Sequence, residues 1–171
     1  TIFTICSNTF MNVDFFPQLT ITPIVVGIDG IIIQCGINGS ADDNCVIFGG
    51  KSQFEIVKSA AQVEFRGLKF VGSRGVVIRA LGDSKASATF SDCTFSKGIG
   101  TSAIFLYGGK LDMSATINTT LLPKQGEAMS VRLRNCTISD NDFEIAPLVN
   151  FGGNLNVKLS LFINNEGEVG A

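Results

Sequence analysis

The stretch that decides the fold is residues 63–95, VEFRGLKFVGSRGVVIRALGDSKASATFSDCTF. It starts and ends with the same apolar signature, V-x-F-x-x-L-x-F at 63–70 and A-x-F-x-x-C-x-F at 88–95. A third copy, V-x-L-x-x-C-x-I, lies at 131–138, and a degraded fourth, L-x-V-x-x-S-x-F, lies at 155–162. The copies are 25, 43 and 24 residues apart. A repeat of this length is typical of a solenoid, in which each repeat buries its apolar row against the next.

Within each half of the signature, apolar and polar residues alternate, which predicts short strands with one face buried. The two-residue gap between the halves predicts a bend. A third apolar run follows each copy, at 76–78, 103–106 and 148–149. We therefore expect an all-β fold, a single-stranded right-handed parallel β-helix of about six coils of roughly 25 residues, with three short strands per coil. The handedness follows the general rule for parallel crossovers.

The rest of the chain adds strands, turns and one insertion. Four N-terminal runs look like strands of the first coils, namely 1–5, 24–26, 31–33 and 45–48. An aromatic residue followed by two glycines recurs at 48–50, 107–109 and 151–153, with Leu81-Gly82 as a worn copy, and we expect tight corner turns there. The 43-residue step predicts that residues 110–128 form a loop inserted at one corner. Residues 1–171 are expected to form one domain that is part of a longer chain.

Composition excludes several functions. Of 171 residues, 45% are hydrophobic and 16% charged, and histidine is absent, which excludes Ser-His and Cys-His catalysis. Net charge is −2, but the charge is banded: −4 over residues 1–50, +6 over 51–134 and −4 over 135–171. We expect no nucleic-acid partner. The most apolar segment, residues 21–35, is interrupted by proline, glycine and aspartate, so no membrane span is predicted.

Cysteines and N-glycosylation sequons indicate a secreted protein, located outside the cell or at its surface. The chain has five cysteines and three sequons, at Asn38, Asn118 and Asn135. Residue 1 is Thr, and we expect that a leader, or more, has been removed. No capping helix is predicted at either end, so further coils of the same chain or other copies are the expected partners there.

The cysteines allow several pairings. We favour a disulfide between Cys35 and Cys45, which would close a polar loop; Cys6 would then pair outside this segment, or replace Cys45 as the partner of Cys35. Cys93 and Cys136 share one register in successive copies. They are expected to form a small buried ladder, with a disulfide between them as the less favoured alternative.

Two charged groups are candidate sites. Arg66, Arg134 and Lys158 share an outward register, with Arg132 beside them. They would suit an acidic polysaccharide, although a solvated sheet face is the favoured interpretation. Calcium is the one cofactor that the sequence leaves open. Its candidate ligands are Asp140, Asp142 and Glu144, which also suit a solvated turn; the pair Asp42-Asp43 is interpreted in the same way.

The repeated phrases at 63–73, 88–98, 131–141 and 157–167 resemble right-handed parallel β-helix proteins of the pectin-lyase-like superfamily. The segment from Ile33 to Gly50 is similar to secreted β-helix proteins of diatom-type algae. The resemblance implies the fold and a choice among polysaccharide lyases, hydrolases, adhesins and structural proteins. Hydrolases of this fold use Asn-Thr-Asp, Asp-Asp and Gly-His-Gly elements, and the catalytic patterns of the superfamily do not carry over to this chain.

Three functions are therefore expected, in decreasing order. The first is an extracellular structural or adhesive protein, because the scaffold lacks a recognisable catalytic constellation. The second is a binding module for acidic polysaccharide on the basic residues. The third is a calcium-dependent polysaccharide lyase that uses the acidic group with a nearby arginine. No catalytic residue is assigned.

Overall fold

The computed structural model describes residues 1–13, 23–57, 62–82, 87–108, 130–143, 145–151 and 154–167. Most of these residues are in strands, and one short 3-10 helix, η1, spans Ala41–Asp43. Within these ranges no helix has the length and apolar character needed to cross a membrane. The strands are β1 (Ile2–Ile5), β2 (Phe10–Asn12), β3 (Ile24–Val26), β4 (Ile31–Cys35), β5 (Cys45–Phe48), β6 (Ser52–Ile56), β7 (Gln62–Arg66), β8 (Leu68–Val71), β9 (Val76–Gly82), β10 (Ser87–Ser91), β11 (Thr94–Ser96), β12 (Ser102–Gly108), β13 (Ser130–Arg134), β14 (Thr137–Ser139), β15 (Asp142–Phe143), β16 (Leu148–Phe151), β17 (Asn154–Lys158), β18 (Leu161–Ile163) and β19 (Glu166–Gly167).

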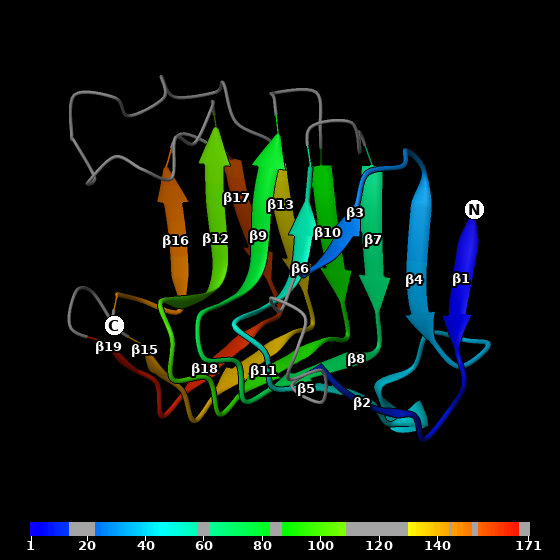
Figure 1. Ribbon diagram of the computed structural model, residues 1–171, viewed down its shortest axis with the longest axis horizontal. Helices are drawn as coiled ribbons and strands as arrows, with labels where there is room; N and C mark the ends of the chain where they lie inside the picture. The colour runs from blue at the N-terminus through cyan, green and yellow to red at the C-terminus, as the bar shows by residue number, and fades with distance from the viewer. Residues whose placement is uncertain are drawn as a thin grey trace.

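The strands form three parallel sheets through which the chain passes in turn (Figure 1). Sheet A has the order β1-β4-β7-β10-β13-β17, sheet B the order β2-β5-β8-β11-β14-β18, and sheet C the order β3-β6-β9-β12-β16. In the central part of the chain, each strand pairs with the third strand after it in sequence order. We call one passage through the sheets a repeat, so that repeat 1 is β1–β3 and repeat 6 contains β17 and β18. The short strands β15 and β19 pair separately. The fold is all-β with parallel sheets, as a parallel solenoid requires.

The register confirms that the apolar signature stacks on itself. Phe90 pairs with Phe65 on one side and with Leu133 on the other, and Leu133 pairs with Val157. The 43-residue step keeps the register because its extra residues fall between β12 and β13. The predicted loop 110–128 lies outside the described residues. Matching positions of successive repeats therefore form continuous columns, whatever the length of the connection between them.

The bend between sheets A and B is made by the second residue of the two-residue gap. In four repeats this residue has positive φ: Gly67 (66°), Asp92 (55°), Asn135 (51°) and Leu159 (51°). Glycine, Asn and Asp adopt this conformation at low cost, and leucine does not. Each of these residues directly follows a strand of sheet A, and the strand of sheet B begins one or two residues later, so one left-handed residue turns the chain from one sheet into the next.

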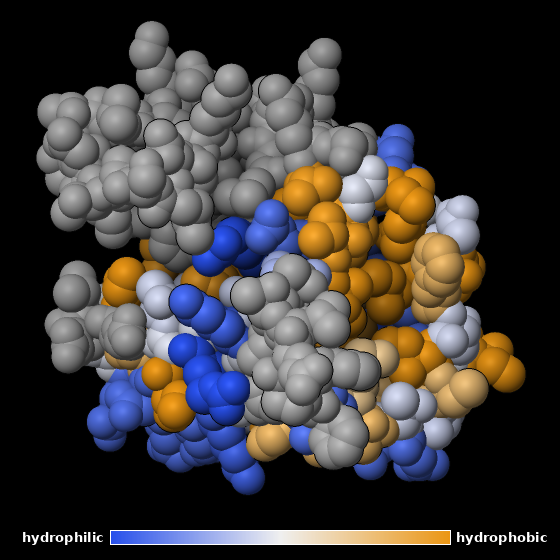
Figure 2. Space-filling view, in the orientation of Figure 1, coloured by the Kyte–Doolittle hydropathy of each residue, from blue (hydrophilic) through white to orange (hydrophobic). Residues whose placement is uncertain are grey.

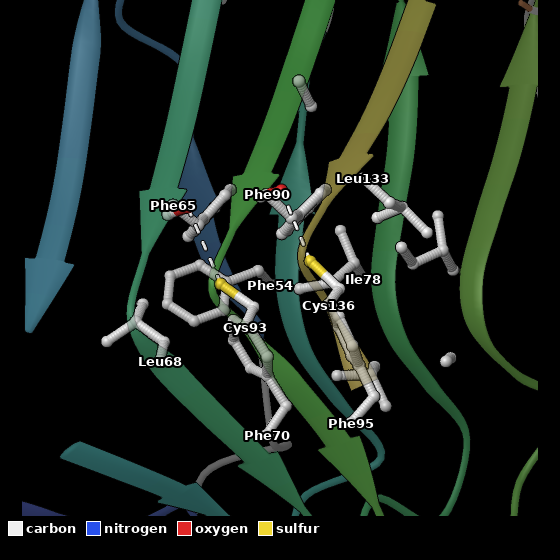
Figure 3. Packing of buried hydrophobic residues seen from close by; sticks show 14 of the residues in the cluster. Phe54, Phe65, Leu68, Phe70, Ile78, Phe90, Cys93, Phe95, Leu133 and Cys136 are labelled. Atoms are coloured by element: carbon white, nitrogen blue, oxygen red, sulfur yellow. Dashed lines mark hydrogen bonds between the residues drawn. The ribbon is translucent and has the colours of Figure 1, made fainter. Parts of the chain in front are cut away.

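The core is built from stacked inward side chains (Figure 3). Phe65 stacks on Phe90 with a centroid distance of 4.9 Å and an interplanar angle of 2°, and Phe70 stacks on Phe95 at 4.9 Å. Phe54 of sheet C meets Phe65 edge to face at 5.0 Å. Phe65, Phe70, Phe90 and Phe95 are buried, as the signature predicts, and so is Phe54, which lies outside the signature. Phe162, in the inward register of the last copy, is 44% exposed, so the prediction that it joins the core is wrong. Aromatic pairs in these geometries add to the free energy of burying the rings, which holds the three sheets together.

The three aromatic-Gly-Gly motifs do not occupy one equivalent corner. Tyr107 pairs with Leu81 and with Phe151 at the end of sheet C, so the later motifs and the worn copy are equivalent. Phe48 instead ends β5 of sheet B, and Gly49 and Gly50, with φ of 79° and 77°, lead from sheet B into sheet C. The described residues of the three motifs thus lie at two different places in the fold, because glycine favours a turn without fixing its position.

Candidate functional site

The outward face of sheet A carries the basic residues that the sequence placed in one register. Ser91 pairs with Arg66 and with Arg134, and Arg134 pairs with Lys158. Arg132 lies in the neighbouring outward column, where it pairs with Asn156. Parallel strands are about 4.8 Å apart, so charges in successive repeats follow the axis at that spacing.

Arg66 does not act as a free cation. Its Nη2 atom lies 2.8 Å from Oε2 of Glu64 on the same face of β7. The hydrogen bond that Arg66 donates to Glu64 raises the pKa of Arg66, and the nearby carboxylate charge adds to this effect while burial opposes it. Because Glu64 balances its charge and Ser91 follows in the next repeat, Arg66 is separated from the other basic residues.

Arg132, Arg134 and Lys158 remain as an exposed group, which we call the basic patch. Within the ranges that the structure describes, no carboxylate lies within 4.0 Å of their charged nitrogens. Elsewhere, Arg79 of sheet C lies 3.7 Å from Glu55 on the adjacent strand. The basic patch is thus a cluster of cations on a flat sheet face, able to donate charge-assisted hydrogen bonds to an anionic ligand.

The expected calcium ligands are not gathered in the described part of the chain. Oδ1 of Asp140 accepts a hydrogen bond of 3.1 Å from Nδ2 of Asn164. Asp142 is exposed and pairs in register with Glu166, and Glu144 lies outside the described residues. Among the residues described, no group of three His, Cys, Asp or Glu side chains is placed to hold a metal ion.

The pair Asp42-Asp43 has a structural role in the loop between β4 and β5. Ser40 caps the short helix η1 by accepting from the backbone N–H of Asp42 at 3.2 Å. Oδ1 of Asp43 accepts from Ser7 at 2.8 Å, and its carbonyl accepts from the N–H of Asn8 at 2.6 Å. These bonds tie the loop to repeat 1.

The structure contains a disulfide between Cys35 and Cys45, the pair that the sequence favoured, with Cα atoms 5.6 Å apart. It closes the loop over residues 36–44. Cys6 is free and exposed. Closing this short loop restricts the unfolded chain and so stabilises repeat 2.

Cys93 and Cys136 are free, buried and in the same column, as a small ladder requires (Figure 3). Each thiol lies against the repeat before it: Sγ of Cys93 donates to the carbonyl of Phe65 at 3.6 Å, and Sγ of Cys136 to that of Phe90 at 3.4 Å. Burial raises the pKa of the Cys93 thiol well above its usual value, because the thiolate loses its hydration. Such a thiol packs as a small apolar group and is a poor nucleophile.

The three sequons differ in their surroundings. Asn38 is exposed in the disulfide-closed loop. Asn135 is exposed at the bend between sheets A and B, and its Nδ2 donates to Oδ1 of Asp92 in the preceding repeat. Asn118 lies outside the described residues. Of the two described sequons, that of Asn38 therefore has the nitrogen that would carry a glycan on an exposed loop. The corresponding nitrogen of Asn135 is already hydrogen-bonded to the preceding repeat.

Sequence reasoning missed an inward polar ladder. Asn141 is only 3% exposed; its Nδ2 donates to the Phe95 carbonyl at 3.1 Å and to Oδ1 of Asn165 at 2.8 Å, and its Oδ1 accepts from the N–H of Gly98. The two asparagines are 24 residues apart, the same step as the last two copies of the signature. That spacing in the sequence could have indicated that the two asparagines lie in one column. Their amides satisfy backbone groups at the bend after sheet B, which is a structural role.

An apolar hollow of about 300 Å³ opens at the repeat 1 end. Figure 2 shows hydrophobic side chains gathered over this end of the molecule, around β1 and β3. Its lining includes Phe3, Met11, Ile24, Ile28, Ile33 and Phe54. Almost all of this surface is apolar, so the hollow offers packing but few hydrogen bonds.

Comparison with protein-family models, with curated proteins and with solved structures gave no match.

Proposed function

We propose that this chain is a right-handed parallel β-helix that serves as a rigid structural or adhesive element outside the cell. The observation that carries the proposal is the register: three parallel sheets in which inward residues stack over successive repeats. A parallel crossover returning to the same sheet is right-handed in nearly all proteins, which supports the handedness and the closing of the three sheets into one coil. The repeated phrases resembling the pectin-lyase-like superfamily support the same fold.

An extracellular location is part of the proposal. A disulfide between Cys35 and Cys45 is stable in an oxidising compartment and rare in a reducing one. Asn38 adds an exposed sequon on the loop that this disulfide closes. Rigidity supports a mechanical role, because stacked rings and ladder hydrogen bonds connect each repeat directly to the next.

The test is an activity assay joined to a localisation assay. The secreted, tagged protein is incubated with uronate and sulfated polysaccharides, with and without calcium, and unsaturated products are measured by absorbance. We expect no product and retention of intact protein on the cell surface or wall. Cleavage at a useful rate that requires Asp140 and Asp142 would instead support the lyase alternative.

A second candidate function is binding of an acidic polysaccharide at the basic patch. The observation that favours it is specific: Arg134 and Lys158 are exposed in adjacent repeats, with Arg132 beside them, and no described carboxylate neutralises them. A spacing of about 4.8 Å per repeat is close to the length of one sugar residue, so that successive acidic groups could meet successive cations.

The binding test compares charge reversals of equal size. Arg134→Glu should reduce affinity for a sulfated or uronate polysaccharide at least tenfold at low salt, and the wild-type affinity should fall as salt screens the charges. Lys97→Glu is the matched control, since Lys97 is exposed at a different corner. Equal effects of the two variants would show that only net charge matters and would rule out the basic patch as the site.

A further inference from the structure

One asparagine of this chain is followed by glycine. The sequence contains twelve asparagines, and only Asn38, in Asn38-Gly39-Ser40, precedes a glycine. Asparagine side chains are chemically labile, and the nucleophile that attacks them is the backbone nitrogen of the next residue. Glycine has no Cβ atom, so its nitrogen reaches the side-chain carbon with the least hindrance. This pair is therefore the place in the sequence where such an attack is least obstructed.

Asn38 lies in the disulfide-closed loop of repeat 2, which has a neighbouring repeat on both sides. Towards repeat 1, Oδ1 of Asp43 in this loop accepts a hydrogen bond from Ser7. Towards repeat 3, a Cβ atom at Gly67 would lie 2.6 Å from the carbonyl oxygen of Gly39. Asn38 is exposed even so. Its exposure is thus a property of the loop, with repeats 1 and 3 both in place.

The two groups that would react are free of hydrogen bonds. Among the residues that the structure describes, nothing bonds to the side-chain amide of Asn38 or to the backbone N–H of Gly39. The carbonyls just before them are held instead, because Nε2 of Gln34 donates to Gly36 at 3.1 Å and to Ile37 at 2.7 Å. No hydrogen bond therefore has to break at either reacting group before the nitrogen attacks.

The other described asparagines lack at least one of these features. Nδ2 of Asn135 donates to Asp92 in the preceding repeat, and Asn141 is only 3% exposed. Asn156 is exposed, but the next residue is Val157 of β17, whose branched side chain crowds its own backbone nitrogen. Of the described asparagines, only the one before glycine combines an exposed and unbonded amide with an unhindered neighbour.

We propose that Asn38 is a deamidation site and that an N-linked glycan on the same side chain blocks the reaction. Nδ2, the atom that deamidation expels, is also the atom that carries the glycan of an Asn-X-Ser sequon. The two modifications therefore exclude each other. The deamidation requires only the loop and stands independently of the proposed function, whereas the protection by a glycan rests on the proposed extracellular location.

The reaction needs only water as a second reactant. The backbone nitrogen of Gly39 attacks Cγ of Asn38; the new N–Cγ bond closes a five-membered succinimide, the Cγ–Nδ2 bond breaks, and Nδ2 leaves as ammonia with the proton of the attacking nitrogen. Water then adds to one of the two ring carbonyls and opens the ring. Opening at Cγ restores the normal backbone and gives aspartate, and opening at the main-chain carbonyl gives isoaspartate.

Both products change the loop. Each adds one negative charge at position 38, and isoaspartate also lengthens the main chain by one carbon atom. Gly39 is buried, and a Cβ atom there would lie 2.8 Å from the Cβ of Arg66 in repeat 3. The longer main chain of isoaspartate therefore does not fit without moving the loop away from repeat 3.

The first experiment measures the reaction on unglycosylated protein from a bacterial periplasm, where the disulfide can form. The folded chain is incubated at mildly alkaline pH, and digested samples are analysed by mass spectrometry; replacing –NH₂ by –OH adds about 1 Da. Asn38 should react at least tenfold faster than Asn156 in the same sample. Asn38→Gln, which keeps an amide on a longer side chain, should not gain this charge. Equal rates at Asn38 and Asn156 would overturn the proposal.

The second experiment uses the same chain secreted by a eukaryotic host, with peptide mapping to separate molecules that carry a glycan at Asn38 from those that do not. The unglycosylated molecules should deamidate at the periplasmic rate, and the glycosylated ones at least tenfold more slowly. Equal rates in the two fractions would overturn the protective role. Secretion without any glycan at Asn38 would overturn the glycan half alone, because the rates in the periplasmic protein decide the deamidation separately.

Discussion

The middle repeats and the end repeats have the same pattern and different surroundings. Phe65 and Phe90 are completely buried, whereas Phe3 and Phe162, in inward positions of the end repeats, are about half exposed. Each strand is too short to bury its own side chains. An inward side chain is thus buried only when repeats on both sides cover it. The apolar signature allows repeats to stack, but it does not by itself place a residue in the core.

The largest effect should come from removing an aromatic ring in the middle. Phe90→Ala should lower the free energy of unfolding by about 3–5 kcal/mol, because it removes a buried ring that contacts Phe65, Phe70 and Phe95. Phe162→Ala at the end should cost less than about half of that. Urea unfolding at low protein concentration measures both, and equal losses would contradict the comparison.

The second prediction concerns the disulfide within repeat 2, whose loop is hydrogen-bonded to repeat 1. Replacing both Cys35 and Cys45 by alanine should lower the free energy of unfolding by about 2–3 kcal/mol, since the unfolded chain regains the freedom of a ten-residue loop. Cys6→Ser, which changes an exposed free cysteine, is the control and should change little. A loss confined to repeat 2, detected by amide hydrogen exchange, would sharpen the comparison; no loss at all would show that the loop is held by its hydrogen bonds alone.

The left-handed bends allow a stabilising change at the repeat 6 end. Leu159 has φ of 51° and is 88% exposed, so Leu159→Asn should raise the free energy of unfolding by about 0.5–1 kcal/mol. Gly67→Asn, at the equivalent bend of repeat 3, should instead destabilise. A Cβ atom there would lie 2.5 Å from the backbone carbon of Ser40. Thermal denaturation measures both variants, and a stabilised Gly67→Asn would show that the loop moves aside.

The smallest effect concerns pH and the buried thiol of Cys93. Its pKa is raised in the folded protein, so its contribution to stability is complete below the pKa of the unfolded chain and is lost as the pH rises through the folded pKa. As the pH rises above the pKa of the unfolded thiol, the wild type should lose stability relative to Cys93→Ala. Urea unfolding from pH 6 to 9 measures this difference between the two proteins. A difference that stays constant with pH would mean that the thiol is accessible to solvent in the folded state.

Most of the fold was predictable because its determinants are local. The spacing of Val63, Ala88, Val131 and Leu155 gives the register of sheet A directly, including the 43-residue step. The inward rings, the bends and the column of Arg66, Arg134 and Lys158 follow from the same alternation. The aromatic-Gly-Gly motif at 48–50 correctly indicated a tight turn, but glycine alone does not identify which two sheets a turn connects.

The candidate site was only partly predictable, because ion pairing and burial depend on neighbours in space. Sequence placed Arg66 with the other basic residues, and only the structure pairs it with Glu64 and leaves Arg132, Arg134 and Lys158 as the exposed cations. Likewise, the banded charge places Asp43 in an acidic N-terminal third, and only the structure shows that its carboxylate accepts a hydrogen bond from Ser7.

By itself, the sequence determined the period, the inward and outward faces and the columns in which residues would lie, because these depend only on spacing along the chain. The tertiary structure decided which members of a column are covered, which charges are neutralised and which surfaces remain apolar and open. Those properties depend on the presence of a neighbouring strand about 4.8 Å away, and a repeat at the end of the stack has such a neighbour on one side only.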